Sequence, residues 1–357
     1  VARRDGSYPM DALPLLPESG VIEIPPAQTR QLWLTLDAVG LEPGAYGAVV
    51  KVTELDEAGL RHEIPVLLKV LDLALPQPSP LHFCTWAYLE NSAFKDHLQA
   101  AIADLVAHGN NVFPIGSGPT GKYDASGNII ESDWSALDTM VARYAPHGMI
   151  LLQGYNAISY AGEGQPPPGA QDRAFGNWIR AIGERMSSLG VAYDRWAIYV
   201  VDEPGLNTYW GIDYLLKTAR AIKEADPRVQ TYTDPIVDMG PRELRLAAPY
   251  LDIWCPEQDS YYRLWGETAK MFAAERLEIM KNDSEQVWTY ECFAGAKELD
   301  PLGYYRHQAW LAWMFGLNGM GFWTYCTAPT NLWEPMQGEY VLAYPGREGP
   351  IPSKRWE

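Results

Sequence analysis

The sequence predicts an α/β protein: a (β/α)₈ TIM-type barrel preceded by a small antiparallel β-sandwich domain. From residue 81 onward, eight short apolar runs alternate with segments of helical periodicity, which is the pattern of a barrel. Before residue 76, short runs of alternating apolar and polar residues are separated by turns that contain Pro and Gly, which is typical of a sandwich. Residues 76–80 read Pro-Gln-Pro-Ser-Pro and predict a linker between the two domains.

The first domain, residues 1–75, is expected to be all β. Its predicted strands cover 21–24, 31–36, 48–53 and 62–70, and Glu42-Pro-Gly-Ala-Tyr46 predicts a turn before the third. Because the chain starts with Val1, we expect this domain to be incomplete at its N-terminus.

The second domain, residues 81–357, is expected to supply the barrel. Its predicted strands are 81–86, 111–115, 149–153, 196–201, 229–233, 251–255, 287–290 and 319–325. Between them, apolar residues recur at helical spacing, as in Leu98, Ile102 and Leu105. An open doubly wound sheet is the competing fold, but it normally carries a Gly-rich turn after its first strand. Here the first strand ends in Thr85-Trp-Ala-Tyr88 without glycine, so the barrel is favoured.

Composition narrows the choice of partner. The net charge of −17 argues against nucleic acid or an anionic membrane surface as ligand. No apolar run is long enough to span a bilayer, and no signal peptide is visible. The 14 Trp and 21 Tyr can fill a core, but rings at strand ends can also stack on the apolar faces of sugars. A carbohydrate is therefore the expected ligand.

Cysteines and histidines give no sign of a metal or cofactor site. The four Cys form no C-x-x-C pair and no His pairs with another at ligand spacing, so we expect no metal and no cofactor. Buried thiols are the default interpretation of Cys84, Cys255, Cys292 and Cys326, and one disulfide between neighbouring strand ends stays open.

The pair Asp202 and Glu203 is the strongest candidate for chemistry. The apolar run 196–201 ends in these two carboxylates, and Pro204 then breaks the strand. In a barrel, the C-terminal ends of the strands form the active site. On a regular strand the two side chains would point to opposite faces, but at a strand end before Pro204 both can reach the mouth. A cap on the next helix or an ion pair with a neighbouring Arg is the structural alternative.

Two carboxylates suit glycoside hydrolysis, which needs a proton donor for the leaving oxygen and a second group opposite. In one class, the 2-acetamido oxygen of the substrate is the nucleophile, and the second carboxylate orients the acetamido group. Adjacent Asp202 and Glu203 suit that arrangement, with Glu203 as acid/base and Asp202 as the orienting group. Close carboxylates also raise each other's pKa, which would help Glu203 to stay protonated near neutrality.

The chain resembles glycoside hydrolase family 123 and the related domain-of-unknown-function family 4091 along nearly its whole length. The resemblance rests on the turn and on Asp202-Glu-Pro204 described above, and on five C-terminal segments: Val287-Trp-Thr-Tyr-Glu-Cys292, Tyr305-Arg306, Gly321-Phe-Trp-Thr-Tyr325, Tyr344-Pro-Gly346 and Pro352-Ser-Lys-Arg-Trp-Glu357. It implies a retaining β-N-acetylgalactosaminidase that uses substrate assistance, and a secreted or periplasmic location. Such proteins normally continue past this C-terminus, so we expect the chain to be truncated there.

Two other interpretations stay open. Glu291 occupies a position of the seventh strand where the resemblance leads us to expect an uncharged residue. Glu203 with Glu291 would suit a double-displacement glycosidase acting on a sugar without an acetamido group, whereas a salt bridge of Glu291 with Arg306 or Lys297 would be structural. The other interpretation is a carbohydrate-binding barrel that has lost turnover.

Polar and aromatic residues at the remaining strand ends are candidates for substrate contacts, each about as readily explained by packing. They are Trp86, Asn111, Tyr155, Asp234, Glu257, Tyr290, Glu291, Trp323, Tyr325 and Trp333.

Overall fold

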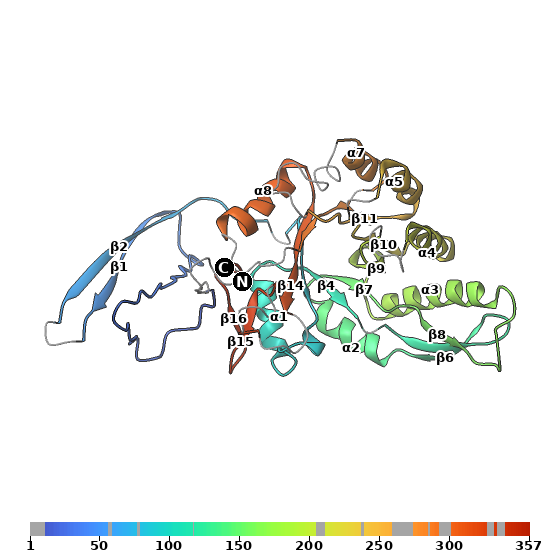
Figure 1. Cartoon of the computed structure of the whole chain (residues 1–357), viewed down its shortest axis with the longest axis horizontal. Helices are drawn as coiled ribbons and strands as arrows, with labels where there is room; N and C mark the ends of the chain where they lie inside the picture. Colours follow the sequence, from blue (N-terminus) through green and yellow to red (C-terminus); the bar gives the residue numbers. More distant parts are fainter. Residues whose placement is uncertain are drawn as a thin grey trace. The chain divides into compact units, whose positions relative to one another are not determined.

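The computed structural model describes residues 11–55, 59–76, 79–116, 118–204, 211–236, 239–258, 274–284, 286–292, 301–326, 332–333 and 340–357 (Figure 1). The chain divides into two compact units. The smaller comprises Leu16–Pro80, and the larger comprises Val1–Leu15 with Leu81–Glu357.

The smaller unit contains one antiparallel hairpin. Strands β1 (Gly44–Thr53) and β2 (Arg61–Val70) pair from Gly44 opposite Val70 to Thr53 opposite Arg61. These strands agree with two of the four predicted ones. Among the described residues of this unit, 21–24 and 31–36 form no strand, so the predicted sandwich is not found there. Alternation predicts a strand only where another strand supplies hydrogen bonds, and the half-exposed Trp33 lies in a segment that has none described.

The larger unit is a mixed α/β structure with a six-stranded parallel sheet in the order β12-β11-β10-β9-β7-β4. A second parallel sheet has the order β13-β14-β3. The strands are β3 (His82–Ala87), β4 (Val112–Ile115), β7 (Met149–Leu152), β9 (Trp196–Val201), β10 (Gln230–Thr233), β11 (Ile253–Trp254), β12 (Gln286–Val287), β13 (Tyr290–Glu291) and β14 (Gly319–Cys326). Each of the eight predicted runs coincides with one of these strands, except that β12 and β13 share the run 287–290.

Asparagine side chains continue the hydrogen bonding between β3 and β4, which belong to different sheets. The Asn111 backbone N–H donates to the Phe83 carbonyl (3.0 Å). The Asn111 side chain accepts from the Phe83 N–H (2.8 Å) and donates to the Leu81 carbonyl (2.8 Å). The Asn110 side chain likewise accepts from the Thr85 N–H (2.6 Å). Asn111, a predicted sugar contact, therefore joins two strands at the amino end of β4.

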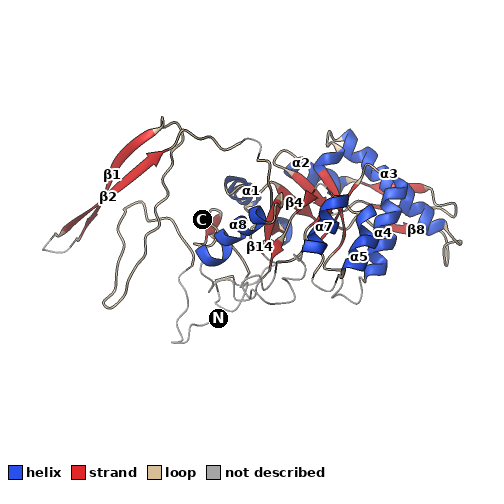
Figure 2. Cartoon of the chain, turned by 90° about the horizontal axis from the view of Figure 1, so that it is seen from above, coloured by secondary structure: helices blue, strands red, loops and turns tan. Residues whose placement is uncertain are grey.

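Helices lie around the strands of the larger unit (Figure 2). They are α1 (Leu98–Ala107), α2 (Ser135–Tyr144), α3 (Ala170–Ser188), α4 (Ile212–Ala225), α5 (Pro241–Ala247), α7 (Ala274–Asp283) and α8 (His307–Met314), with 3₁₀ turns at Leu89–Asn91, Tyr193–Arg195 and Ala248–Tyr250 and a π-helical turn at Leu302–Arg306. The α-helices bury apolar side chains against the strands, as Leu105 of α1 and Ile222 of α4 illustrate, although α8 also leaves Trp310 and Trp313 exposed.

Both faces of the parallel strands are buried, in two separate clusters. The cluster toward the helices includes Trp178, Ile198 and Phe322. The second cluster draws side chains from the other face of the strands: Cys84, Trp86, Val112, Met149, Leu151, Ala197, Tyr199, Tyr232, Ile253, Cys255, Trp288 and Tyr290. Because neighbouring residues of a strand point to opposite faces, Ile198 and Tyr199 enter different clusters. We call the second set the inner cluster.

Two further small sheets were not predicted, a mixed one and an antiparallel pair. In the sheet of order β6-β5-β8, β5 (Thr120–Tyr123) and β6 (Ile129–Asp133) follow β4, and β8 (Ala157–Tyr160) follows β7. Near the C-terminus, β15 (Ala343–Pro345) pairs with β16 (Pro350–Pro352). These strands are only three to five residues long, so sequence periodicity could not reveal them.

A buried ion pair joins the two ends of the larger unit. Arg355 donates to Asp11 (2.7 Å), and Asp11 also accepts from the Tyr344 hydroxyl (2.7 Å). The Arg355 side chain is only 1% exposed. Backbone bonds on either side, such as Leu13 N–H to the Pro352 carbonyl (2.8 Å), align the two segments. The C-terminal motif that contains Arg355 therefore holds residues 11–13 against the C-terminal part of the larger unit.

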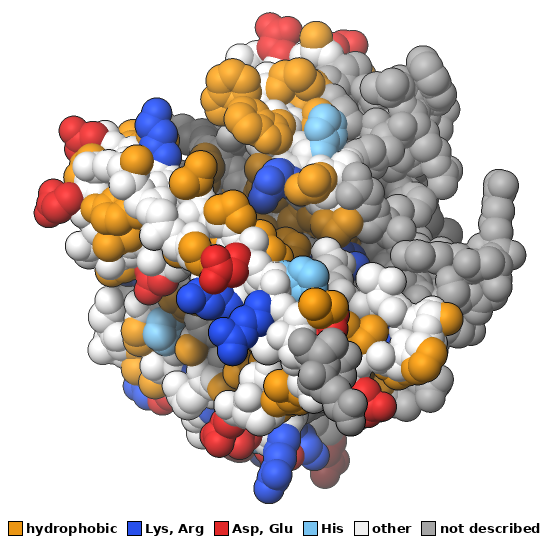
Figure 3. Space-filling model, turned by 90° about the vertical axis from the view of Figure 1, so that its left-hand side faces the viewer, with side chains coloured by type: hydrophobic (Ala, Val, Ile, Leu, Met, Phe, Trp, Pro, Cys, Tyr) orange, Lys and Arg blue, Asp and Glu red, His pale blue; other side chains and the backbone are white. Residues whose placement is uncertain are grey.

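The remaining general features concern thiols, membrane and charge. All four cysteines are free thiols, and Cys84, Cys255 and Cys326 are buried. Among the described residues, no helix combines the length and the apolar character that crossing a bilayer requires. On the face drawn in Figure 3, Lys and Arg side chains lie among acidic, apolar and uncharged ones instead of forming one basic surface.

Candidate active site

A β-bulge in β9 sets the direction of Asp202. Tyr232 of β10 lies opposite Tyr199, but the next residue, Thr233, lies opposite Val201, so Val200 is the extra residue of β9. Val200 and Val201 both pack toward the helices, whereas Tyr199 belongs to the inner cluster. The bulge thus returns Asp202 to the side of Tyr199, and the two side chains are hydrogen-bonded (2.7 Å).

Glu203 has a strained backbone. Its φ is +43°, and among the described non-glycine residues only Ala27 shares a positive φ. A left-handed conformation outside glycine costs about 1–3 kcal/mol and persists where surrounding contacts hold it. Two contacts hold Glu203: its N–H donates to Asp234 (3.1 Å), and its carboxylate accepts from the Tyr290 hydroxyl (2.5 Å). Such strain is typical of functional sites.

Asp234, at the end of β10, connects the two members of the pair. One oxygen accepts the Glu203 N–H, and the other is hydrogen-bonded with the Tyr199 hydroxyl, which also contacts Asp202. Asp234 is 2% exposed. Burial, followed by the charge of Asp202, raises the pKa of the Asp234 carboxyl well above its usual value.

Tyr290 holds the carboxylate of Glu203 from the opposite side of the site. Its backbone is bridged to Glu257, and the Gln258 N–H donates to its carbonyl (2.8 Å). The Trp86 ring packs against the Tyr290 ring at 5.5 Å. Burial, followed by the charges of Asp234 and Glu257, raises the pKa of Tyr290, so its hydroxyl keeps its proton and donates to Glu203.

Replacing Tyr290 by Phe should weaken catalysis without abolishing it. We expect kcat/KM to fall by about tenfold, in line with the loss of one hydrogen bond to a charged group. Removing this donor disfavours the ionised form of Glu203, so the alkaline limb of the pH–rate profile should move to higher pH. An unchanged profile would show that the hydroxyl does not act on Glu203.

Tyr88 interacts with Asp202, and Trp323 interacts with Tyr88. Burial, followed by the charge of Asp202, raises the pKa of Tyr88, while a hydrogen bond with Trp323 opposes that rise. Trp323 is partly exposed, packs on the inner cluster and meets Tyr340 edge-on at 4.8 Å. The carboxylates therefore share their site with rings of the kind that stack on sugars.

Three predicted substrate contacts lie elsewhere. Tyr155 packs against Phe175 of α3. The Tyr325 hydroxyl donates to Asp104 of α1 (2.7 Å) on the helix side of β14. Trp333 is 49% exposed and packs on Tyr344. A position near a strand end predicts that a residue is close to the site. It does not predict which face of the strand the side chain occupies, so these three predictions could not separate the two faces.

Glu291 lies on the helix side of its strand. Tyr290 is part of the inner cluster, so its neighbour Glu291 faces the other way, where it accepts from the Tyr304 hydroxyl (2.6 Å) and is 2% exposed. Of the two ion-pair partners considered for Glu291, Arg306 is exposed and Lys297 lies outside the described residues. Glu203 thus contacts Tyr290 of the inner cluster, whereas Glu291 contacts Tyr304 on the helix side of its strand.

The site therefore comprises Asp202, Glu203, Asp234, Glu257, Trp86, Tyr290 and Trp323 from the prediction, together with Tyr88 and Tyr199. Tyr199 could not be selected from the sequence because it lies inside its strand and meets Asp202 only through the bulge. Among the described residues, no group of three or more His, Cys, Asp or Glu side chains could hold a metal ion.

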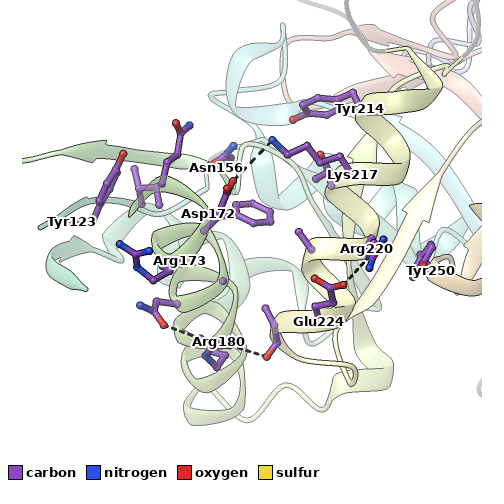
Figure 4. Close-up of a pocket in the computed structure, with 18 of the residues that line it drawn as sticks. Tyr123, Asn156, Asp172, Arg173, Arg180, Tyr214, Lys217, Arg220, Glu224 and Tyr250 are labelled. Atoms are coloured by element: carbon purple, nitrogen blue, oxygen red, sulfur yellow. Dashed lines mark hydrogen bonds and ion pairs between the residues drawn. The ribbon is translucent and has the colours of Figure 1, made fainter. Parts of the chain in front are cut away.

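A groove of about 1120 Å³ lies apart from these carboxylates, between α3 and α4 (Figure 4). Its charged side chains are largely paired: Lys217 with Asp172 (4.0 Å) and Arg220 with Glu224 (2.7 Å). None of the site carboxylates lines it. The groove lies between helices α3 and α4, apart from the carboxylates at the end of β9.

The sequence matches no protein-family model and no curated protein. Several solved structures resemble the fold. A family 39 glycoside hydrolase from Bacteroides cellulosilyticus WH2 has a TM-score of 0.48 at 13% identity over 88% of this chain and 69% of that one. An endo-1,4-β-D-mannanase from Thermotoga petrophila RKU-1 scores 0.44 at 12% identity, covering 68% and 88%. A β-D-glucuronidase from Dictyoglomus thermophilum scores 0.45 at 11%, covering 87% and 56%. These neighbours are glycoside hydrolases of different specificity, and the likeness is too distant to decide what this chain does.

Proposed function

We propose that the two parallel sheets of the larger unit are arcs of one (β/α)₈ barrel. Three observations support it. The order of the strands follows the chain, the asparagine side chains bridge β3 and β4, and β12 runs directly into β13. Seven of the strand positions contribute side chains to the inner cluster, as expected for the filled interior of a barrel.

We further propose that the protein is a retaining glycoside hydrolase that cleaves β-linked N-acetylhexosamine, with N-acetylgalactosamine favoured by the family resemblance. The observation that carries the proposal is the pair at the end of β9: a bulge aims Asp202, and a strained backbone with two hydrogen bonds fixes Glu203. Glu203 serves as acid/base and Asp202 orients the 2-acetamido group. Trp86, Glu257 and Trp323 contribute the sugar contacts.

In the proposed mechanism, the glycosidic bond is hydrolysed in two steps. The acetamido oxygen attacks the anomeric carbon while Asp202 accepts a hydrogen bond from the acetamido N–H. The bond to the leaving oxygen breaks, and that oxygen takes the proton of Glu203. Water then adds to the anomeric carbon, gives its proton to the Glu203 carboxylate and reopens the cyclised acetamido group. Two inversions leave the anomeric configuration retained.

A double-displacement mechanism with Glu291 as nucleophile is the second candidate. That mechanism needs the two carboxyl groups about 5 Å apart on either side of one bond. Glu291 is instead hydrogen-bonded with Tyr304 on the helix side of its strand, which argues against a role as nucleophile beside Glu203. A third candidate, a carbohydrate-binding barrel without turnover, does not account for the strain at Glu203.

Hydrolysis of matched chromogenic sugars tests the proposal. We expect cleavage of the 4-nitrophenyl β-N-acetylgalactosaminide and no cleavage of the β-galactoside, which lacks the internal nucleophile. Cleavage of the galactoside, lost on Glu291→Gln, would support the second candidate. Binding of both sugars without cleavage of either would support the third.

A further inference from the structure

The Tyr199 hydroxyl can form hydrogen bonds with both of its carboxyl neighbours only if one of them is protonated. The single Tyr199 hydroxyl is hydrogen-bonded with an oxygen of Asp202 (2.7 Å) and with an oxygen of Asp234. A phenol carries one proton and can donate to only one acceptor. The other contact is a hydrogen bond only if the carboxyl group on that side supplies the proton.

The surroundings place that proton on Asp234. Asp202 is exposed, so water can solvate its charge, whereas Asp234 is 2% exposed. Among the residues that the structure describes, the titratable groups that face Asp234 from its own and neighbouring strands are Cys84, Tyr88, Tyr199, Asp202, Glu203, Tyr232, Cys255 and Tyr290. None of these is a cation, so none compensates a negative charge on Asp234. The raised pKa of Asp234 agrees with this assignment.

We infer that Asp234 is a protonated positioning residue that orients both members of the catalytic pair. Its O–H donates to Tyr199, the Tyr199 O–H donates to Asp202, and its second oxygen accepts the N–H of Glu203. The chain of hydrogen bonds directs the Asp202 carboxylate toward its acceptor role and holds the strained Glu203 backbone. The inference rests on the proposed function for the roles of Asp202 and Glu203, but the location of the proton does not depend on it.

Two substitutions separate a protonated from an ionised Asp234. Asn has the same shape, and its amide can donate to Tyr199 and accept from Glu203, as the neutral acid does. Leu has a similar volume and can do neither. We expect Asp234→Leu to lose about a hundredfold in kcat/KM, the size of a misplaced catalytic group, and Asp234→Asn to lose at most about a tenth as much. Equal losses in both would overturn the neutral assignment, and equal retention in both would overturn the positioning role.

A stability measurement gives a readout that does not need activity. A carboxyl that stays protonated when folded but ionises when unfolded makes the folded state less stable as pH rises above its ordinary value of 3.8. Asp234→Asn removes this loss. The melting temperature of Asp234→Asn minus that of wild type should therefore increase between about pH 5 and about pH 8.

A difference that stays constant over this range, or that decreases, would mean that Asp234 is ionised and that the proton sits on Asp202. If the pH-dependent difference is observed but no sugar is cleaved by wild type, the proton assignment stands and the proposed glycosidase function fails.

Discussion

Replacing Glu203 by Gln is expected to lower kcat/KM for an N-acetylhexosaminide with a poor leaving group by about a thousandfold. Gln keeps the shape of Glu203 and can still accept from the Tyr290 hydroxyl, so the site should stay assembled. It cannot deliver a proton to the leaving oxygen, and this proton transfer is the step that an alkoxide leaving group requires. The measurement is steady-state hydrolysis of a disaccharide, with substrate binding followed in parallel by calorimetry.

Glu291→Gln is the matched control for this experiment. It makes the same change in a buried carboxylate whose hydrogen bond is with Tyr304 on the helix side of the strand. We expect its kcat/KM to stay within about threefold of wild type. If Glu291→Gln were as inactive as Glu203→Gln while melting normally, the substrate-assisted mechanism would have to be abandoned for double displacement.

The second large effect is on stability. Replacing Arg355 by Ala leaves Asp11 buried without its cation, and the loss of one partner of a buried ion pair costs about 3–5 kcal/mol. Arg355 also donates to the Val341 carbonyl (2.5 Å) and to the Tyr305 hydroxyl (3.0 Å), so several acceptors lose their donor together. We therefore expect a clearly lower free energy of unfolding in urea, followed by tryptophan fluorescence.

Arg220→Ala controls for the loss of an arginine as such. Arg220 pairs with Glu224 on the exposed surface of α4, where solvent screens the interaction, so no measurable change in unfolding is expected. The double variant Asp11→Ala, Arg355→Ala should be less destabilised than the sum of the two single variants, because it leaves no uncompensated charge. Additive losses would show that the two side chains do not act as a pair.

The parallel strands were predictable from the sequence because they are buried on both faces. A strand that packs against helices on one side and other strands on the other reads as a continuous apolar run, as 196–201 does, and such runs stand out between helical segments. The end of such a run marks the end of the strand, where a barrel has its active site. Asp202 and Glu203 could therefore be selected from the sequence alone.

Directions of side chains could not be predicted in the same way. The bulge at Val200 adds one residue to β9 and reverses the alternation after it, which brings Asp202 to Tyr199. No residue type in this strand predicts that bulge. The directions of Tyr325 and Glu291 were likewise not predictable: Tyr325 contacts Asp104 of α1, and Glu291 contacts Tyr304 of the π-helical turn. The predicted sandwich is not confirmed for a related reason: the alternating segment 31–36 has no partner strand among the described residues.

The most direct test of the central claim is the affinity of a thiazoline that mimics the cyclised acetamido intermediate of N-acetylgalactosamine. If the substrate's own acetamido group is the nucleophile and Asp202 holds it, the thiazoline should bind at least about a hundredfold more tightly than free N-acetylgalactosamine. Asp202→Ala should remove most of that preference. A thiazoline that binds wild type no better than the free sugar would contradict the mechanism proposed for Asp202 and Glu203.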